Sequence, residues 1–331
     1  MKTSDKIKKI GQAQKALAEH KFNCRLCPRD CSVNRNTTTG YCSSENTAFV
    51  SHIGLHFGEE PVLSGHTDTE QNSNQNPSSC YGSGTIFFTG CHLKCLHCQN
   101  HQISWGYQGQ NISVKGLAHS MLGLQKKGAL NINLVSPTHM LLPILSALKT
   151  ALQMGLKIPL VFNSSGYEKR KIIRQLNGII DLYLPDLKYF SSQISKKLSG
   201  VSDYFDTAQK AVYEMSIQQP DLILDESGIA QKGLIVRHLL IPGEVDDSLR
   251  LLDWVKENLP NTIGISLMSQ FYPCFKTPPE YRKKITADEY EKAVRAAKQS
   301  GFRHLFVQPE LFSDLKHLIP DFSQKNPFQW D

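Results

Sequence analysis

Residues 85–98 read Thr85-Ile86-Phe87-Phe88-Thr89-Gly90-Cys91-His92-Leu93-Lys94-Cys95-Leu96-His97-Cys98 and decide the fold. The first four residues are apolar or β-branched and predict a short strand. Three cysteines with the spacing Cys-x3-Cys-x2-Cys then follow on a loop. Gly90 allows the backbone to come close to whatever the cysteines bind, where a side chain would crowd it. The stretch therefore predicts a strand that ends in a metal-binding loop.

Six further apolar runs of strand length follow. They lie at 131–135, 158–162, 179–184, 234–241, 262–267 and 304–307, separated by helix-like segments near 114–127, 138–154, 168–176, 205–218, 247–258 and 287–299. This alternation predicts a parallel sheet, because each crossover needs a helix to return the chain. We expect an α/β fold with a full or partial (β/α) barrel; a doubly wound open sheet is the alternative. In a barrel, reactive groups lie at the carboxyl ends of the strands.

The composition is that of a globular protein, and the chain has 331 residues, enough for one large domain with a small addition. Its formal net charge of +7 comes from 37 basic and 30 acidic residues spread along the chain, so nucleic acid is not an expected partner. No apolar run approaches the ~20 residues that span a bilayer. The first residues also lack the apolar stretch of a secretory signal. We therefore expect a cytoplasmic protein with no membrane partner.

The cysteines are concentrated in the first third of the chain. Eight of the nine lie between Cys24 and Cys98. In a reducing cytosol such clusters bind metal more often than they form disulfides. We expect residues 1–65 to form a helix and a Cys-rich metal-binding segment, 66–80 a polar linker or loop, and 81–331 the barrel domain.

Cys91, Cys95 and Cys98 suit an iron–sulfur cluster with four irons. Such a cluster usually has four thiolate ligands, so three thiolates leave one iron open to a small molecule. The alternative is a zinc ion whose fourth ligand is a histidine such as His92, His97 or His101. The position at the end of the first strand of a βα series favours the cluster.

The motif from Gly90 to Asn100 resembles the defining motif of the radical S-adenosylmethionine (SAM) superfamily, and more narrowly that of the pyruvate formate-lyase activating enzymes and their relatives. The likeness extends in order through nearly all of the chain. It implies a [4Fe–4S] cluster on the three cysteines, with SAM chelating the open iron. The resemblance also implies that Gly90, His97 and Asn100 contact the cofactors. His97 stands where the family usually has an aromatic residue packed near the adenine.

Other residues at strand ends match the SAM pocket of this family. The resemblance implies that Ser136 and Thr138 meet the SAM amine, although Ser136 before Pro137 also suits a helix cap. It places Asn163 and Ser165 near the ribose and carboxylate of SAM, with a plain strand-to-helix turn as the alternative.

Three charged residues and one glutamine complete this set. Asp186 and Lys188 should point to the same side of a strand, where they suit the charged ends of SAM; a surface ion pair is the alternative. Arg237 lies in an apolar run and needs an anionic partner. The resemblance implies the SAM carboxylate, and a structural carboxylate is the alternative. Gln270 stands where the activating enzymes have a histidine.

A second set of thiols lies upstream. Cys24, Cys27, Cys31 and Cys42 have the spacing Cys-x2-Cys-x3-Cys-x10-Cys, which suits a tetrahedral zinc ion or an auxiliary iron–sulfur cluster. Relatives of the subgroup carry a similar segment. The alternative is four unrelated reduced thiols.

Taken together, the resemblance implies an enzyme, a radical SAM oxidoreductase. It would reductively cleave SAM to a 5′-deoxyadenosyl radical that abstracts hydrogen, with activation of a protein substrate of the glycyl-radical type as one outcome. The alternatives are a radical SAM enzyme with a small-molecule substrate, and a non-catalytic zinc or iron–sulfur module for binding or electron transfer. Expected partners are SAM, an electron donor such as flavodoxin or ferredoxin, and a protein substrate.

Overall fold

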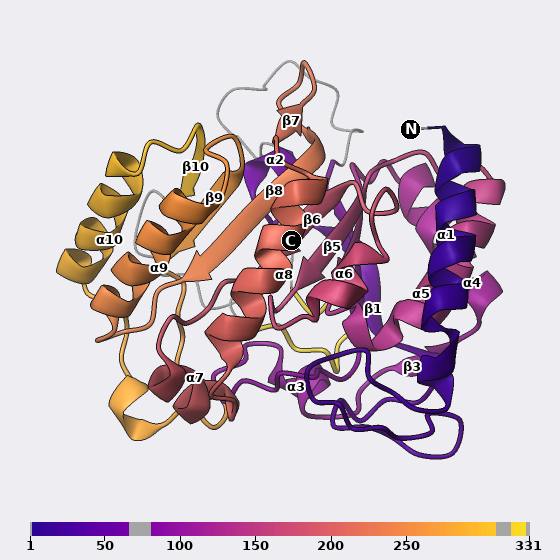
Figure 1. Cartoon of the computed structure of the whole chain (residues 1–331), viewed down its shortest axis with the longest axis horizontal. Helices are drawn as coiled ribbons and strands as arrows, with labels where there is room; N and C mark the ends of the chain where they lie inside the picture. The colour runs from indigo at the N-terminus through magenta and orange to yellow at the C-terminus, as the bar shows by residue number, and fades with distance from the viewer. Residues whose placement is uncertain (1, 66–80, 309–318, 329–331) are drawn as a thin grey trace.

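The computed structural model of the chain describes residues 2–65, 81–308 and 319–328. One ten-stranded sheet runs through these residues in the order β10-β9-β8-β6-β5-β4-β2-β1-β3, with β7 paired to β8 (Figure 1). The strands are β1 (Ala48–His56), β2 (Ser83–Phe88), β3 (Gln110–Ile112), β4 (Ile132–Val135), β5 (Leu160–Ser164), β6 (Leu182–Pro185), β7 (Ile223–Leu224), β8 (Ala230–Leu239), β9 (Gly264–Met268) and β10 (His304–Val307).

The strands β2, β4, β5, β6, β8, β9 and β10 pair in parallel. They overlap the seven apolar runs found in the sequence, although their ends differ by a few residues: β8 begins four residues earlier and β6 three residues later than expected. Every residue of β2 is buried, as a parallel strand covered on both faces requires. The strand order follows the chain without the reversal of a doubly wound sheet. Within the described residues β10 and β3 are the two edges, so the expected α/β partial barrel is confirmed.

The antiparallel strand β1 was not expected from the sequence. It pairs with β2 and with β3, and most of its residues are only partly buried. This weak alternation left no clear strand signal. Part of the expected N-terminal segment, 1–65, therefore belongs to the sheet of the barrel.

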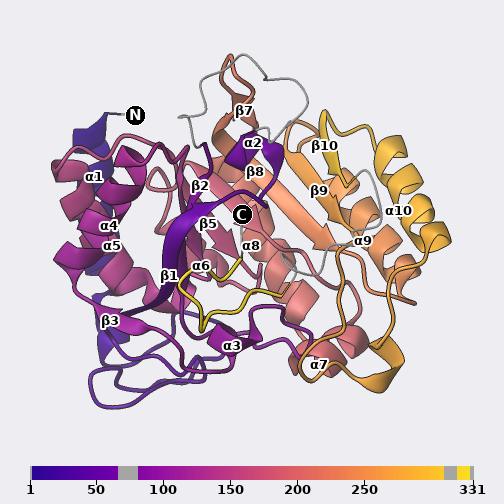
Figure 2. The same cartoon turned by 180° about the vertical axis from the view of Figure 1, so that it is seen from behind.

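Helices cover the outside of the sheet. They are α1 (Thr3–Leu17), α2 (Pro61–Ser64), α3 (His101–Ser104), α4 (Val114–Lys126), α5 (Leu141–Gln153), α6 (Arg170–Arg174), α7 (Ser192–Ser199), α8 (Tyr204–Gln218), α9 (Val245–Asn258) and α10 (Ala287–Gln299), with short 3₁₀ turns at η1 (Ala18–Lys21), η2 (Thr138–Met140) and η3 (Pro279–Tyr281). Figures 1 and 2 show α1, α4 and α5 grouped at one end of the sheet and α9 and α10 at the other. No helix of the described residues has the length and hydropathy to cross a bilayer.

Local sequence explains where several helices begin. The Ser113 side chain accepts a hydrogen bond from Gly116 N at the start of α4, and Thr286 and Glu289 form a capping box at α10. The buried residues of α1, which are Ile10, Ala13 and Leu17, form one stripe that packs on α5. These contacts hold the N-terminal helix against the barrel.

The residues 319–328, which we call the C-terminal segment, pack beside β2. Phe322 and Phe328 have ring centroids 5.5 and 5.3 Å from that of Phe87. Gln102 Oε1 accepts a hydrogen bond from Phe322 N at 2.7 Å. The C-terminal segment thus packs against β2 and α3. The expected linker 66–80, which includes Cys80, lies outside the described residues.

Candidate active site

A cavity of about 350 Å³ lies at the carboxyl ends of the parallel strands. Nearly all of the residues expected at the site line it: Gly90, Cys91, Cys95, His97, Cys98, Asn100, Ser136, Asn163, Ser165, Asp186, Lys188, Arg237 and Gln270. They come from the ends of several strands and from the 91–98 loop. Their convergence agrees with the rule that parallel strands present functional groups at one edge. Their roles in binding stay predictions.

Each of the three loop thiols accepts a hydrogen bond. Leu93 N lies 3.4 Å from Cys91 Sγ, Ser104 Oγ lies 3.2 Å from Cys98 Sγ, and Ser199 Oγ lies 3.1 Å from Cys95 Sγ. Donors directed at sulfur stabilise thiolate rather than thiol, and such hydrogen bonds are typical of ligands in iron–sulfur sites. The donor set therefore fits a cluster held by three thiolates.

Burial keeps the Cys91 and Cys98 thiols protonated in the absence of metal. Desolvation raises the pKa of Cys91 to about 11 and that of Cys98 to about 12. A bound cation would replace these protons, since metal ligation requires the thiolate. Every described cysteine is a free thiol.

A network of buried charges forms the far wall of the cavity. Arg237 Nε lies 3.0 Å from Asp186 Oδ1, and Arg237 Nη1 lies 3.2 Å from Glu59 Oε2. Lys188 Nζ lies 2.7 Å from Asp186 Oδ2, and Arg237 Nη2 donates to Asn163 Oδ1 at 2.6 Å. Asp186 and Lys188 therefore point to the same side, as expected. Arg237 has the structural carboxylate partners that formed the alternative in the sequence analysis.

The charges of this network support one another. Burial would raise the pKa of Asp186, but Lys188 and Arg237 outweigh it and the pKa falls below its usual value. Burial would lower the pKa of Lys188, yet Asp186 raises it to about 12. Burial raises the pKa of Glu59, which Arg237 only partly offsets. The wall thus carries a fixed Asp186–Lys188 pair and a guanidinium that is shared between two carboxyl groups.

Ser165 Oγ and His97 Nδ1 lie in the cavity lining and have no hydrogen-bond partner among the described residues. The His97 ring stacks on Phe271 with centroids 5.5 Å apart, and burial lowers its pKa to about 3. A neutral imidazole and a free hydroxyl can both form a hydrogen bond with a polar ligand. Such a bond is favoured, because a buried polar group without a partner is costly. The lining therefore suits a polar ligand.

One expected residue does not reach the cavity. Thr138 is fully buried, and its Oγ1 donates to Glu168 Oε2 at 2.7 Å. The chain turns at Ser136, whose φ is +56°, and the Thr138 side chain lies in the core rather than in the cavity lining; its contact with a cofactor stays a prediction. Burial raises the pKa of Glu168 to about 8, which favours a protonated carboxyl group beside Thr138. The helix-cap interpretation of Ser136 is also not observed, since the turn η2 has no side-chain cap.

The four upstream cysteines lie close together in a turn-rich segment. A Cβ atom on Gly40 would be 2.8 Å from Cys31 Sγ and 3.9 Å from Cys42 Sγ, so these two thiols flank the glycine. Burial raises the pKa of Cys24, and the nearby Cys31 and Cys42 raise it further. Within the described residues no group of three or more His, Cys, Asp and Glu side chains converges on a point that could hold one metal ion. A zinc ion or an auxiliary cluster at these cysteines stays a prediction.

The upstream segment packs directly on the 91–98 loop. A Cβ atom on Gly90 would lie only 2.3 Å from Cys42 O. Arg29 donates from Nε to His92 O at 2.8 Å and from Nη2 to Leu93 O at 3.1 Å. The segment that holds the upstream cysteines therefore contacts the backbone of the 91–98 loop.

Several residues of the cavity wall were not among the expected site residues. Glu59 follows β1 and lines the cavity; the acidic pair before Pro61 was the signal that could bring acidic groups to the mouth, with a simple turn as the alternative. Pro320 and Phe328 reach the cavity from the C-terminal segment, which has no motif that could have placed it there.

The fold and the cavity define an α/β partial-barrel protein with a three-cysteine loop at the mouth of its strands. No protein-family model matches the chain. The chain is 31% identical over 288 residues to the uncharacterized protein MJ0674 of Methanocaldococcus jannaschii. The aligned region covers 84% of this chain and 75% of that protein. The chain belongs to the family of this protein.

Similar solved structures were also found. They include methylornithine synthase (PylB), with a TM-score of 0.47, 13% identity and coverage of 66% of this chain and 60% of that one. Streptococcus suis SuiB has a TM-score of 0.43, 15% identity and coverage of 66% and 47%. SuiB bound to S-adenosylmethionine has a TM-score of 0.43, 17% identity and coverage of 66% and 45%. The chain spans less than two thirds of the length of each of these structures.

Proposed function

We propose that this protein is a radical SAM enzyme that holds a [4Fe–4S] cluster on Cys91, Cys95 and Cys98. The observation that carries the proposal is the position of these thiols in one cavity with charged and polar groups from the ends of the neighbouring strands. Within the described residues no fourth cysteine lines this cavity. Three thiolates would leave one iron of a four-iron cluster for a small ligand.

The bound cofactors would supply the chemistry, in which one electron cleaves SAM to methionine and a 5′-deoxyadenosyl radical that abstracts hydrogen from the substrate. The protein's own residues would bind and orient. Leu93 N, Ser104 and Ser199 hold the three sulfurs, and the Asp186–Lys188 pair offers both signs of charge to an amino acid group.

The remaining residues would place the nucleoside part of SAM and exclude water. His97 and Ser165 offer their free polar atoms, and Phe87, Phe88 and Phe328 form an apolar wall. An apolar lining with a few convergent polar groups is the usual composition of a cofactor pocket.

The size of the cavity bears on the substrate. Pockets for drug-sized ligands measure ~300–1,000 Å³, and this one holds about 350 Å³. One cofactor would fill most of it, so the hydrogen donor would have to reach in as a narrow group. This supports the activation of a protein, in which an extended peptide presents a backbone C–H bond, as in pyruvate formate-lyase activating enzymes.

The experiment uses the full chain, loaded anaerobically with iron and sulfide and reduced with dithionite in the presence of SAM. We expect 5′-deoxyadenosine to form, and Cys95→Ala to abolish it. Cys274→Ala is the matched control: Cys274 lies outside the cavity lining, and its thiol lies within hydrogen-bond distance of the carbonyl groups of His97 and Cys98. A protein that carries the cluster by absorption spectroscopy but never forms 5′-deoxyadenosine would refute the proposal. If 5′-deoxyadenosine forms, transfer of deuterium into it from labelled candidate proteins or from labelled small molecules would distinguish a protein substrate from a small-molecule substrate.

A further inference from the structure

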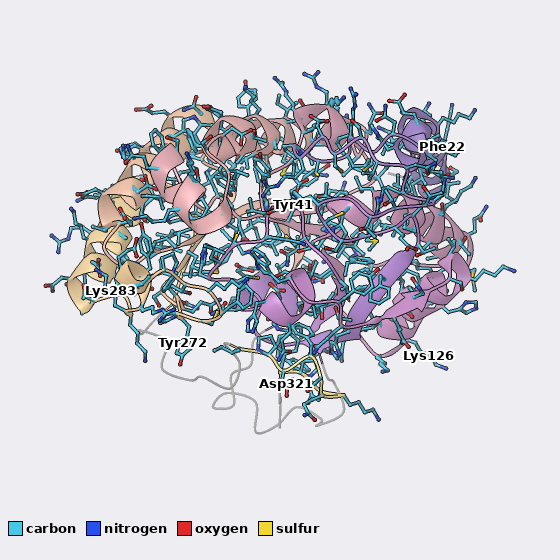
Figure 3. The ribbon with its side chains drawn as sticks, turned by 90° about the horizontal axis from the view of Figure 1, so that it is seen from below. Phe22, Tyr41, Lys126, Tyr272, Lys283 and Asp321 are labelled. Atoms are coloured by element: carbon cyan, nitrogen blue, oxygen red, sulfur yellow. The ribbon has the colours of Figure 1, made fainter. Side chains whose placement is uncertain are left out.

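Basic and aromatic side chains gather on the side of the 91–98 loop that does not line the cavity. We call them the basic–aromatic patch, and they are Arg29, Tyr41, Lys94, Trp105, Phe275 and Lys276. They come from the N-terminal segment, the loop itself, the turn after α3 and the chain after β9. Figure 3 views this face, with Tyr41 near its centre.

The members of the patch are linked by cation–π contacts. The Arg29 guanidinium lies 3.8 Å from the ring centroid of Tyr41, and Lys94 Nζ lies 5.3 Å from Tyr41 and 5.7 Å from Trp105. Lys276 Nζ lies 5.1 Å from Trp105 and 5.2 Å from Phe275. Tyr41 and Phe275 are 41% and 39% exposed, so the patch faces solvent. Three cations are thus held in a row over aromatic rings.

The patch is attached to the backbone of the 91–98 loop. Trp105 Nε1 donates to Cys95 O at 3.0 Å, Lys276 N donates to Leu96 O at 3.1 Å, and Arg29 Nε donates to His92 O. The loop therefore presents its thiols to the cavity and this patch to solvent. A molecule bound to the patch would be separated from the cysteines by the thickness of one loop.

The cations of the patch have polar partners, such as backbone carbonyl groups for Arg29 and Ser43 Oγ for Lys94, but no carboxylate partner among the described residues. None of Arg29, Lys94 and Lys276 forms an ion pair with a carboxylate in the described part of the chain. Three unpaired cations in one place create a positive field that attracts an acidic surface. Aromatic residues and arginine are also enriched at protein interfaces.

We propose that the basic–aromatic patch is the docking surface for an acidic protein that delivers one electron. The inference rests on the proposed function, which consumes an electron in each turnover. The donor loses one electron and the loaded enzyme gains it, and no bond or proton changes place at the contact. A redox encounter of this kind needs only a small interface, below ~1,200 Å², with opposite charges that speed association.

Nucleic acid fits the patch less well. Proteins that bind single strands offer free aromatic faces on which bases stack. Here cations already lie over the rings of Tyr41 and Trp105, so those faces are not free.

The test compares two charge reversals. Lys276→Glu changes the patch, and Lys126→Glu is the matched control, because Lys126 is an exposed lysine at the end of α4 and lies far from Tyr41 in Figure 3. Binding of an acidic flavodoxin and of an acidic plant-type ferredoxin to the full chain is measured by biolayer interferometry at low and high salt. We expect Lys276→Glu to weaken binding of at least one probe threefold to tenfold, and Lys126→Glu to change it less than twofold.

A second readout uses turnover. With flavodoxin or ferredoxin as the reductant, Lys276→Glu should form 5′-deoxyadenosine more slowly, whereas with dithionite, which needs no docking, its rate should match the wild type. The proposal is overturned if neither flavodoxin nor ferredoxin binds at low salt, or if the two variants weaken binding equally. It is also overturned if Lys276→Glu weakens the binding of a single-stranded RNA 12-mer but leaves the binding of both proteins unchanged. Absence of 5′-deoxyadenosine with dithionite would refute the proposed function instead, and the binding data would still decide the docking surface.

Discussion

Replacing Gly90 by alanine tests how tightly the upstream segment packs on the 91–98 loop. Gly90 has a φ of +89°, and a Cβ atom there would lie 2.3 Å from Cys42 O and 2.7 Å from Ser44 Oγ. Gly200, at the end of α7, has a similar φ of +67° and no atom within 4 Å of its Cβ position. The two glycines therefore differ in crowding but share the left-handed backbone.

The expected cost follows from these two terms. The left-handed conformation costs an alanine about 1–2 kcal/mol, which is the whole expected loss for Gly200→Ala. Gly90→Ala adds the displacement of a backbone carbonyl group, and overpacking of this kind costs about 1–3 kcal/mol. Its free energy of unfolding should thus fall by about 2–5 kcal/mol.

Urea unfolding followed by circular dichroism measures both variants, and iron content after anaerobic loading gives a second readout. We expect Gly90→Ala to bind less iron, because the shift falls next to Cys91, while Gly200→Ala binds as much as the wild type. If the two substitutions cost the same, the upstream segment does not pack tightly on the 91–98 loop in solution.

Three further outcomes are expected. Ser104→Ala removes the hydrogen bond to the Cys98 sulfur, so a chelator should extract iron about tenfold faster, while Ser216→Ala, at a buried serine that bonds Tyr213 O, should leave this rate unchanged. Arg237→Met should lower the free energy of unfolding by about 3 kcal/mol in the wild type. In a Glu59→Gln background the same substitution should cost about 1–3 kcal/mol less; if it costs the same in both backgrounds, Arg237 and Glu59 are not coupled. Since the pKa of Glu168 is raised to about 8 from 4.5, the folded state keeps a proton that the unfolded chain releases, and the free energy of unfolding should fall by roughly 3 kcal/mol from pH 5 to pH 8. Glu168→Gln should remove this fall, and a variant with the wild-type pH dependence would count against the shift.

The sequence predicted the parallel strands and most of the cavity for one physical reason. Parallel strands bring their carboxyl ends to one edge, so side chains as distant in sequence as Asn163 and Arg237 could be assigned to one place. The alternation of side chains along a strand also predicted the shared direction of Asp186 and Lys188. These rules depend on local patterns that the sequence displays directly.

The remaining features depend on contacts that no local pattern encodes. The Thr138 side chain lies outside the cavity lining because it bonds to Glu168, 30 residues further along the chain. The need of Arg237 for an anion was predicted. Its partner Glu59, however, follows β1, which is not a neighbour of the Arg237 strand β8 in the sheet. The packing of Cys42 against Gly90 likewise follows only from the tertiary structure.

The C-terminal segment has a consequence for the order of assembly. The cavity wall includes residues from His56 to Phe328, so it is complete only after the most distant parts of the described chain have met. Such long-range contacts form late, because closing a long loop loses entropy before the contact repays it. The proposed iron–sulfur cluster would meet an open loop if it entered before Phe328 packs on Phe87, whereas it would have to pass an aromatic wall if it entered afterwards.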